Sequence, residues 1–388
     1  MRIGFVCVED ATDVKSWSGT PFHILKNLRE QDVEVELFTP LDRNFRRRLI
    51  LSWALARLQG SPASLDRYPL ALRSYARQLS IKLREHPVDV LFATSSIPIA
   101  LLECSQPIIF WTDAVFHSMY NYYQGSFSKL TRSDVRRGKW QEEESLRRCA
   151  IAAYSSRWAA ETAKELTDPE KIRVLPFGPN MPSQLTEEQI ASLAQKKRER
   201  VPSRCELLFV GMDWGRKGGD TAIETARLLN QAGTVTRLRV VGAKPPQVLP
   251  DFVEYLGFID KNSQDGLRRL SDLFCEADFF ILPTRAEASA IVFCEANLFG
   301  VPTITYATGG VPDYIRDQVN GVCLPPGSPA SHFAEKISQI LSTPGCYQKL
   351  SLGAFHEFKT RLNWSNSVRL LLEFCQEALD KNLASSDR

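Results

Sequence analysis

Apolar runs alternate with amphipathic stretches along the whole chain. In the first half, apolar runs predict strands at residues 2–8, 33–38, 88–94, 108–112, 151–155 and 172–176, and helices are expected at 20–29, 98–104, 133–148 and 156–166. The second half repeats the pattern, with strands expected at 205–210, 238–241, 253–258, 279–283, 302–306 and 322–325, and helices at 221–232, 263–276 and 329–341. Strands that alternate with helices in this way are typical of α/β domains with parallel sheets.

A polar stretch at residues 183–203, which includes the charged run at 196–200, separates the two series. The length of 388 residues favours two domains of ordinary size over one. We therefore expect an N-terminal domain at 1–182, a helical linker at 183–203 and a second domain at 204–363. A final amphipathic helix is expected at 364–388, beginning at Trp364.

The composition narrows the class of protein. A net charge of +3 is too small to favour nucleic acid as a partner. Nine cysteines without a C-x-x-C pair fit neither a disulfide framework nor a zinc site, and they are typical of a reducing compartment. The N-terminus lacks the apolar core of a signal peptide, and no run of 18 apolar residues is present, so we expect a cytoplasmic protein.

One stretch combines basic and apolar residues and admits two interpretations. It could lie on an anionic membrane, which would place the protein at the inner membrane face, or it could be an ordinary amphipathic helix with a solvated face. The stretch consists of Arg43, Phe45, Arg46, Arg47, Arg48, Leu49, Ile50, Leu51 and Trp53.

Residues 277–321 carry the strongest chemical signal in the chain. Glu287 lies in the loop after an apolar strand, and Glu295 lies eight positions later on the helix that follows. In an open α/β sheet, ligands bind outside the carboxyl ends of the strands, where helix N-termini offer N–H groups to phosphates. A carboxylate in that position accepts hydrogen bonds from sugar hydroxyls. The segment therefore predicts a site for a sugar joined to phosphates.

A glycine-rich turn follows the first strand of the second domain. It contains Gly211, Arg216 and Lys217 before a predicted helix. Glycines allow close backbone approach to phosphates, and the two cations could neutralise them. An ordinary solvated turn with two basic residues would have the same sequence.

Three residues of the first domain follow strands in the same way. Gly19 lies between the first strand and its helix, while Asp113 and His117 follow the strand at 108–112. The first turn is not G-x-G-x-x-G, which argues against dinucleotide binding. His117 taken alone could equally be a surface histidine.

The run from Glu287 to Ala296, followed by Gly300-Val301-Pro302 and Gly309-Gly310, resembles the Glu-x7-Glu region of glycosyltransferase family 4. Weaker matches extend the resemblance over most of the chain. It implies the GT-B fold, in which two Rossmann-like parallel-sheet domains face each other across a cleft, and a last helix that packs back on the N-terminal domain. It also implies a retaining glycosyltransferase that uses a nucleotide diphosphate sugar.

The resemblance assigns roles to single residues. It implies that Glu287 contacts the transferred sugar and that Glu295 accepts both ribose hydroxyls of the donor. The remaining donor contacts that it implies are Gly19, Gly211, Arg216, Lys217, Ala290, Ile291, Val292, Gly309 and Gly310. His117 would touch the sugar or its phosphate, and Asp113 would bind acceptor.

This sequence departs from the family pattern at two places. Met212 stands where the family has an arginine, and Arg216 could supply that charge from one turn further on. Ala288-Ser289-Ala290 stands where the family usually has a phenylalanine and then a glycine. The departures put the phosphate geometry and the shape of the sugar pocket in question.

The function expected from the resemblance is transfer of a sugar to a glycan, lipid or small-molecule acceptor, without a cofactor. Because the chain contains no Asp-x-Asp, we expect no metal and assign stabilisation of the diphosphate to helix N-termini, Lys217 and Arg216. Two alternatives stay open. The protein could be a GT-B nucleotide-sugar hydrolase or epimerase, or a non-catalytic sugar-nucleotide binding subunit.

Overall fold

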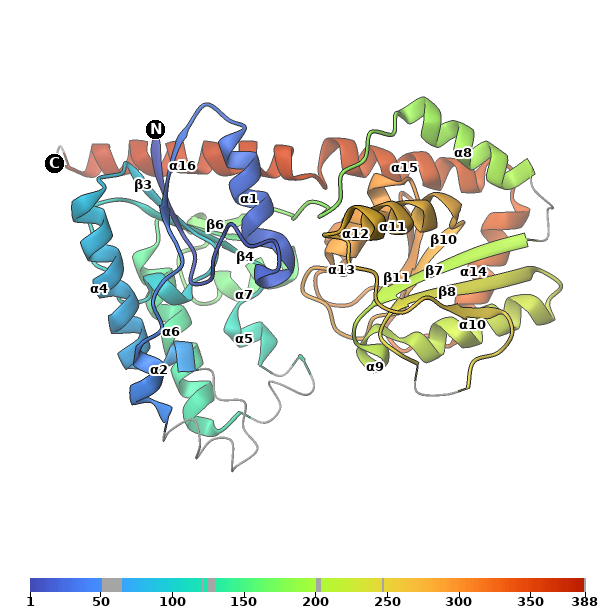
Figure 1. The fold of residues 1–388 in the computed structure, drawn as a ribbon, viewed down its shortest axis with the longest axis horizontal. Coiled ribbons are helices and arrows are strands. Elements are labelled where there is room, and N and C mark those ends of the chain that lie inside the picture. The colour runs from blue at the N-terminus through green and yellow to red at the C-terminus, as the bar shows by residue number, and fades with distance from the viewer. Residues whose placement is uncertain (51–64, 121, 124–129, 200–203, 246–247, 387–388) are drawn as a thin grey trace. The chain divides into compact units, whose positions relative to one another are not determined.

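The computed structural model describes residues 1–50, 65–120, 122–123, 130–199, 204–245 and 248–386. These residues form two units (Figure 1). Unit 1 consists of residues 1–176 together with the C-terminal helix, and unit 2 consists of residues 177–363. Each unit is built around its own six-stranded sheet.

The sheet of unit 1 is parallel throughout, with the strand order β2-β1-β3-β4-β5-β6. Its strands are β1 (Arg2–Val6), β2 (Glu34–Phe38), β3 (Val90–Ala93), β4 (Ile108–Thr112), β5 (Ile151–Tyr154) and β6 (Ile172–Val174). The central strands β3, β4 and β5 are buried along their whole length. Such runs are expected in a parallel sheet that helices cover on both faces, and the predicted α/β class is confirmed.

The helices of unit 1 are α1 (Thr20–Arg29), α2 (Phe45–Arg48), α4 (Pro69–Glu85), α5 (Phe116–Met119), α6 (Arg132–Arg148), α7 (Arg157–Lys164) and α16 (Trp364–Ser386). Helix α4 is not among the elements predicted above, although Leu72, Tyr75, Leu79 and Leu83 follow helical spacing and are buried. The helix expected at 98–104 is wrong, because only a single 3₁₀ turn forms at Ile97–Ile99.

Helix α16 belongs to unit 1 and lies against α1 and β4 (Figure 1). The Trp364 ring packs edge-on against Trp111 of β4, with 5.8 Å between the ring centroids. Further along the helix, Arg173 Nη2 lies 2.6 Å from Glu377 Oε1. An aromatic anchor and an ion pair therefore fix the orientation of this helix on the first sheet.

The basic and apolar stretch forms the short helix α2 within the described residues, while Leu51 and Trp53 lie outside them. Phe45 and Leu49 are buried and pack into unit 1, whereas Ile50 is 60% exposed. Two arginines of the stretch are paired with Asp66: Arg46 Nη2 lies 3.2 Å and Arg43 Nε 3.6 Å from the carboxylate. The described part of the stretch is therefore amphipathic, and membrane contact stays a prediction.

Unit 2 has a second parallel sheet, in the order β12-β11-β10-β7-β8-β9. Its strands are β7 (Arg204–Gly211), β8 (Val235–Gly242), β9 (Val253–Tyr255), β10 (Phe279–Leu282), β11 (Thr303–Tyr306) and β12 (Gly321–Leu324). The order reverses direction between β7 and β10, which are neighbours in the sheet but far apart in the chain. A crevice outside the carboxyl ends of such a strand pair is the usual ligand site of this architecture.

The helices of unit 2 are α8 (Glu187–Glu199), α9 (Trp214–Lys217), α10 (Gly219–Gln231), α11 (Gln264–Glu276), α12 (Ile291–Leu298), α13 (Val311–Tyr314), α14 (Ala330–Ser342) and α15 (Cys346–Thr360). Most of the expected linker forms α8, which packs on α15 within unit 2. The Lys197 Nζ of α8 donates a 2.6 Å hydrogen bond to the carbonyl of Ala277. The helix is therefore an integral part of unit 2.

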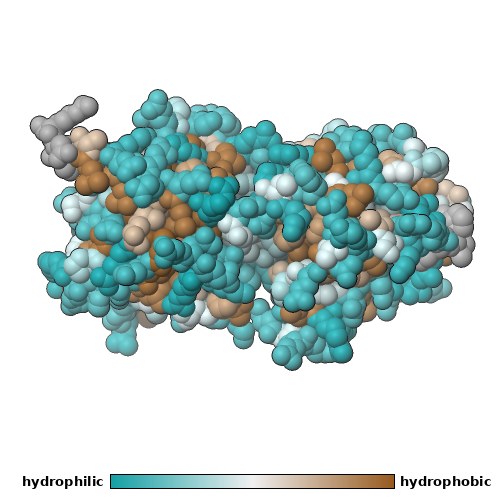
Figure 2. All heavy atoms as spheres, turned by 90° about the horizontal axis from the view of Figure 1, so that it is seen from above, coloured by the Kyte–Doolittle hydropathy of each residue, from teal (hydrophilic) through white to brown (hydrophobic). Residues whose placement is uncertain are grey.

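No helix in the described part of the chain is both long and apolar enough to span a bilayer. Figure 2 shows one face of the molecule, on which hydrophilic side chains predominate and hydrophobic ones form smaller groups between them.

Candidate active site

The candidate site lies at the carboxyl ends of β7 and β10 in unit 2. After β7 the chain turns into α9, and after β10 it forms the loop 283–290 that leads into α12. Since β7 and β10 are hydrogen-bonded neighbours, the two connections meet at the point where the strand order reverses. The glycine-rich turn and the Glu287 loop are thus brought together by topology.

Glu287 lies between two cations from α9. The Lys217 Nζ forms an ion pair with Glu287 Oε2, and Arg216 Nη1 lies 3.2 Å from the same oxygen. Arg216 Nη1 also donates a 2.8 Å hydrogen bond to the carbonyl of Ala286. Lys217 and Glu287 are 9% and 6% exposed, so Lys217 does not lie on a solvated turn. The structure therefore brings together three of the predicted site residues, of which Lys217 and Glu287 are buried and Arg216 is half-buried. Arg216 Nε also lies 3.5 Å from the carboxylate of Asp213, which is largely exposed.

The close approach of α9 to the loop depends on Gly218. Its φ is +77°, and a Cβ at this position would lie 2.1 Å from the carbonyl oxygen of Pro283. Next to it, the N–H of Arg285 donates a 2.8 Å hydrogen bond to the carbonyl of Arg216. Any side chain at residue 218 would separate the two connections, so this glycine is what permits the ion cluster.

Gly309 and Gly310 are attached to the same loop. They follow β11, and the N–H of Gly310 donates a 2.9 Å hydrogen bond to the carbonyl of Glu287. The Thr308 hydroxyl lies 3.3 Å from the carbonyl oxygen of Arg285, to which it donates. The glycine pair is therefore placed beside the backbone of Glu287.

Helix α12 begins directly after this loop, with Ala290 as its N-terminal cap residue. Its first-turn N–H groups, including those of Ile291 and Val292, cannot bond within the helix and are oriented toward its N-terminal end. Ala290 has φ −97°, a conformation that any L-residue adopts. The replacement of the family glycine by alanine therefore leaves the backbone at this position unstrained.

Glu295 lies on α12 and is paired with a lysine that sequence reasoning missed. Lys261 Nζ lies 2.7 Å from Glu295 Oε1, and the two side chains are 28% and 3% exposed. Lys261 precedes α11 in the segment that follows β9. No spacing rule connects it with Glu295, because the two residues meet only through the order of strands in the sheet.

Met212 follows β7 and its side chain is 68% exposed. It contributes no charge where the resembled family has an arginine. The guanidinium of Arg216 is the one that reaches Glu287 from this turn.

In unit 1, Gly19 forms the N-terminal cap of α1 and has φ +88°. The two residues before it, Trp17 and Ser18, have φ of 41° and 56°. Left-handed conformations cost free energy in non-glycine residues and are concentrated at functional loops. The loop that carries the predicted phosphate-contacting glycine is therefore strained.

Asp113 and His117 follow β4, with His117 on α5. His117 Nε2 lies 3.3 Å from Glu143 Oε1 of α6. Burial lowers the pKa of His117, and the charge of Lys139 lowers it further, while Glu143 opposes the shift. The His117 imidazole is therefore biased toward its neutral form. Asp113 is half-buried, and its carbonyl accepts a 3.4 Å hydrogen bond from the hydroxyl of Ser155.

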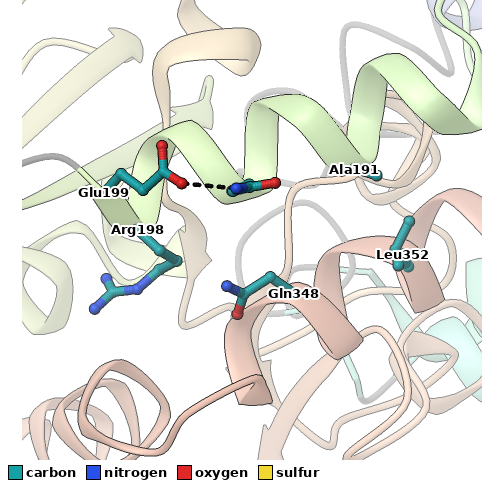
Figure 3. Close-up of a pocket in the computed structure, with 6 residues that line it drawn as sticks. Ala191, Arg198, Glu199, Gln348 and Leu352 are labelled. Carbon is teal, nitrogen blue, oxygen red and sulfur yellow. Dashed lines mark hydrogen bonds between the residues drawn. The ribbon is translucent and has the colours of Figure 1, made fainter.

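A separate surface depression of about 460 Å³ lies between α8 and α15 (Figure 3). Long polar side chains from both helices line it, including Gln195, whose amide donates a 2.7 Å hydrogen bond to Glu199. It contains none of the predicted site residues. Among the described residues, no group of three or more histidines, cysteines, aspartates or glutamates is arranged to hold a metal ion.

Comparison with known proteins agrees with this architecture. Residues 22–180 match the model of Glycosyltransferase Family 4, and residues 204–343 match that of Glycosyl transferases group 1. The lipopolysaccharide glucosyltransferase WaaG of Escherichia coli K12 is 28% identical over 303 residues, which cover 74% of this chain and 73% of WaaG.

Two solved structures share the fold over nearly the whole chain. Sucrose-phosphate synthase from Thermosynechococcus elongatus has a TM-score of 0.68 at 15% identity and covers 98% of this chain and 100% of its own. HepE from Anabaena, solved in complex with UDP-glucose, has a TM-score of 0.61 at 16% identity and covers 97% and 100%. The chain belongs to the group 1 and family 4 glycosyltransferases and has the GT-B fold.

Proposed function

We propose that the protein is a retaining glycosyltransferase whose donor, a nucleotide diphosphate sugar, binds at the carboxyl ends of β7 and β10. The cluster of Lys217, Arg216 and Glu287 is the observation that carries this proposal. Two cations held at a strand-order reversal, next to the N-terminus of α12, form an anion site. The Anabaena neighbour was solved with UDP-glucose, which makes UDP-glucose the first donor to test.

The proposed reaction breaks the bond between the sugar C1 and the diphosphate oxygen and forms a bond from C1 to an acceptor hydroxyl oxygen. Negative charge accumulates on the departing diphosphate, where Lys217, Arg216 and the N–H groups of Ile291 and Val292 stabilise it. The leaving phosphate takes the acceptor proton on the same face of the sugar, so that the anomeric configuration is kept. Glu287 holds the sugar and keeps both cations in place before the donor binds.

The nucleoside end of the donor is assigned to Glu295 and Lys261. Glu295 Oε1 accepts from Lys261, which fixes the carboxylate in a position where it can accept hydrogen bonds from ribose hydroxyls. The similarity to WaaG favours a glycan or glycolipid acceptor, with Asp113 as its proposed contact. His117 is assigned to the transferred sugar or its phosphate.

Assays with a panel of nucleotide sugars, with and without a bacterial glycolipid extract, test the proposed function. Transfer predicts release of a nucleoside diphosphate that depends on the extract. Release without extract would indicate a hydrolase, whereas a thermal shift without any turnover would indicate a binding subunit.

Replacing Glu295 by alanine is expected to weaken binding of UDP-glucose about 10- to 150-fold, because a charge-assisted hydrogen bond contributes about 1.5–3 kcal/mol. Isothermal titration calorimetry with UDP-glucose and with UDP measures the loss, which should appear with both ligands. Lys261→Met should cause a smaller loss, since it removes only the group that orients the carboxylate. Unchanged UDP affinity in a folded Glu295→Ala protein would rule out the ribose contact.

Transfer activity is expected to survive an excess of EDTA, because Lys217, Arg216 and a helix N-terminus are assigned to the diphosphate in place of a metal. The rate of UDP release should be the same within experimental error before and after chelation. Loss of transfer in EDTA that magnesium or manganese restores would contradict this assignment.

A further inference from the structure

The short helix α5, which carries His117, is seated on α6 through a position that excludes any side chain. Gly138 lies in the middle of α6, and a Cβ there would lie 2.2 Å from the Phe116 ring. Phe116 is fully buried and directly precedes His117. Glycine is a poorer helix former than alanine, so its presence within this 17-residue helix is explained by packing and not by helix propensity. The Phe116 ring occupies the space that a side chain at residue 138 would fill.

A buried ionic cluster contacts Phe116 as well. The Arg67 guanidinium lies 4.7 Å from the centroid of the Phe116 ring. Arg67 Nη1 is 3.8 Å from Glu142 Oε2, and the Ser96 hydroxyl donates a 3.1 Å hydrogen bond to the same oxygen. A cation over an aromatic face is attractive, and more so when water is excluded. The ring is therefore held from two sides, by Gly138 and by Arg67.

Glu142 acts on α5 through Arg67. Its carboxylate is buried, and Oε2 lies 3.8 Å from the guanidinium that packs over the Phe116 ring. Phe116 is the first residue of α5, so a contact that fixes its ring also fixes the start of the helix. The next residue of α6, Glu143, reaches the imidazole of His117 itself. Consecutive glutamates of α6 thus act on consecutive residues of α5, Glu142 through Arg67 and Glu143 directly.

We propose that Gly138 and Glu142 are positioning residues that set the location of the His117 imidazole by fixing Phe116 and the start of α5. The functional consequence rests on the role proposed above for His117. Neither contact to the Phe116 ring, from Gly138 or from Arg67, involves the imidazole, so their effect on His117 passes through the backbone of α5. A misplacement of about 1 Å in a reacting group lowers turnover by up to about 100-fold.

The imidazole resonances of His117 test the positioning without any ligand. The chain has five histidines, and His117→Gln identifies the signal of residue 117 in an NMR titration of protein with labelled histidine. The ions that act on the His117 pKa are Lys139 and Glu143 of α6. Helix α7 also packs on α5 and carries Arg157, Glu161 and Lys164. In the unaltered protein the pKa of His117 should lie below its ordinary value of 6.5.

Gly138→Ala should displace the Phe116 ring, move the imidazole toward water and return its pKa toward 6.5. Adding Phe116→Leu removes the ring and should restore much of the original titration. Arg136→Ala, on the exposed side of α6, serves as the control and should leave it unchanged. Glu142→Gln tests the carboxylate and should shift the same signal. If the His117 signal and its titration stay unchanged in folded Gly138→Ala and Glu142→Gln proteins, the proposal is wrong.

A double-mutant cycle connects the positioning to transfer from UDP-glucose. Gly138→Ala alone should lower kcat about 10- to 100-fold with little change in KM for the donor. Adding Gly138→Ala to His117→Ala should cause no further loss, because the group being positioned is already gone. Additive losses would contradict the proposal. A silent His117→Ala would instead remove His117 from the proposed function, while the NMR result would still decide the positioning.

Discussion

Lys217→Ala is expected to lower kcat for sugar transfer by about two to three orders of magnitude, comparable to the loss of one group that stabilises a developing oxyanion. Lys217 is buried at the reversal of strand order and ion-paired with Glu287, so its charge acts where water is largely excluded. The charge on the diphosphate grows as the sugar leaves, and turnover should therefore fall more than ground-state affinity for UDP-glucose.

Steady-state kinetics and UDP binding, measured on the same preparations, separate the two effects. Lys164→Ala is a matched control, because Lys164 of α7 is also paired with a glutamate, Glu161, but the two side chains are 38% and 65% exposed. An equal loss in UDP affinity and in turnover would mean that Lys217 binds the donor but does not stabilise the transition state preferentially. Full activity of a folded Lys217→Ala protein would remove it from the site.

Glu287→Gln is expected to strengthen UDP binding while it lowers the turnover of sugar transfer. The carboxylate faces both Lys217 and Arg216, so it competes with a diphosphate for these cations in the ligand-free protein. Neutralising it should tighten UDP binding by about tenfold at low salt. It should also lower kcat by about 100-fold, because the carboxylate contact to the sugar is lost and the two cations are less well placed.

Calorimetry with UDP, together with kinetics at saturating UDP-glucose, measures both quantities. Thermal unfolding adds a third, since without ligand the variant should be less stable than the unaltered protein and UDP should raise its Tm by more. Glu161→Gln, the partner in the exposed pair with Lys164, controls for loss of a carboxylate in general. A parallel fall in UDP affinity and turnover would mean that Glu287 only supports the nucleotide site.

The proximity of Glu287 to Lys217 and Arg216 can be predicted from the sequence. Each residue lies in the connection that follows an apolar strand, and parallel strands place their carboxyl ends at one edge of the sheet. The sequence also shows which loops contain glycines. It does not show that Gly218 has to meet Pro283, because that contact depends on β7 and β10 being neighbours.

Lys261 and Arg67 escaped the sequence analysis for the same physical reason. Lys261 is a single lysine in a polar loop, and Arg67 is a single arginine near the start of α4. Each of them is paired with a carboxylate that is distant in sequence: Lys261 with Glu295, and Arg67 with Glu142. Local periodicity carries no information on such pairs. Helix α4 is a different case, because its buried residues follow helical spacing and its pattern is therefore present in the sequence.

The central claim is that sugar transfer from a nucleotide diphosphate sugar takes place at the Lys217, Arg216 and Glu287 cluster, with retention of configuration. The most direct measurement follows ¹³C-labelled UDP-glucose by NMR in the presence and absence of a glycolipid acceptor extract. We expect UDP release that requires acceptor, an α-configured glucosyl product, and a fall in the rate of both signals by about two to three orders of magnitude in Lys217→Ala. A β-configured product would contradict retention, and acceptor-dependent transfer that is unchanged in Lys217→Ala would contradict the site.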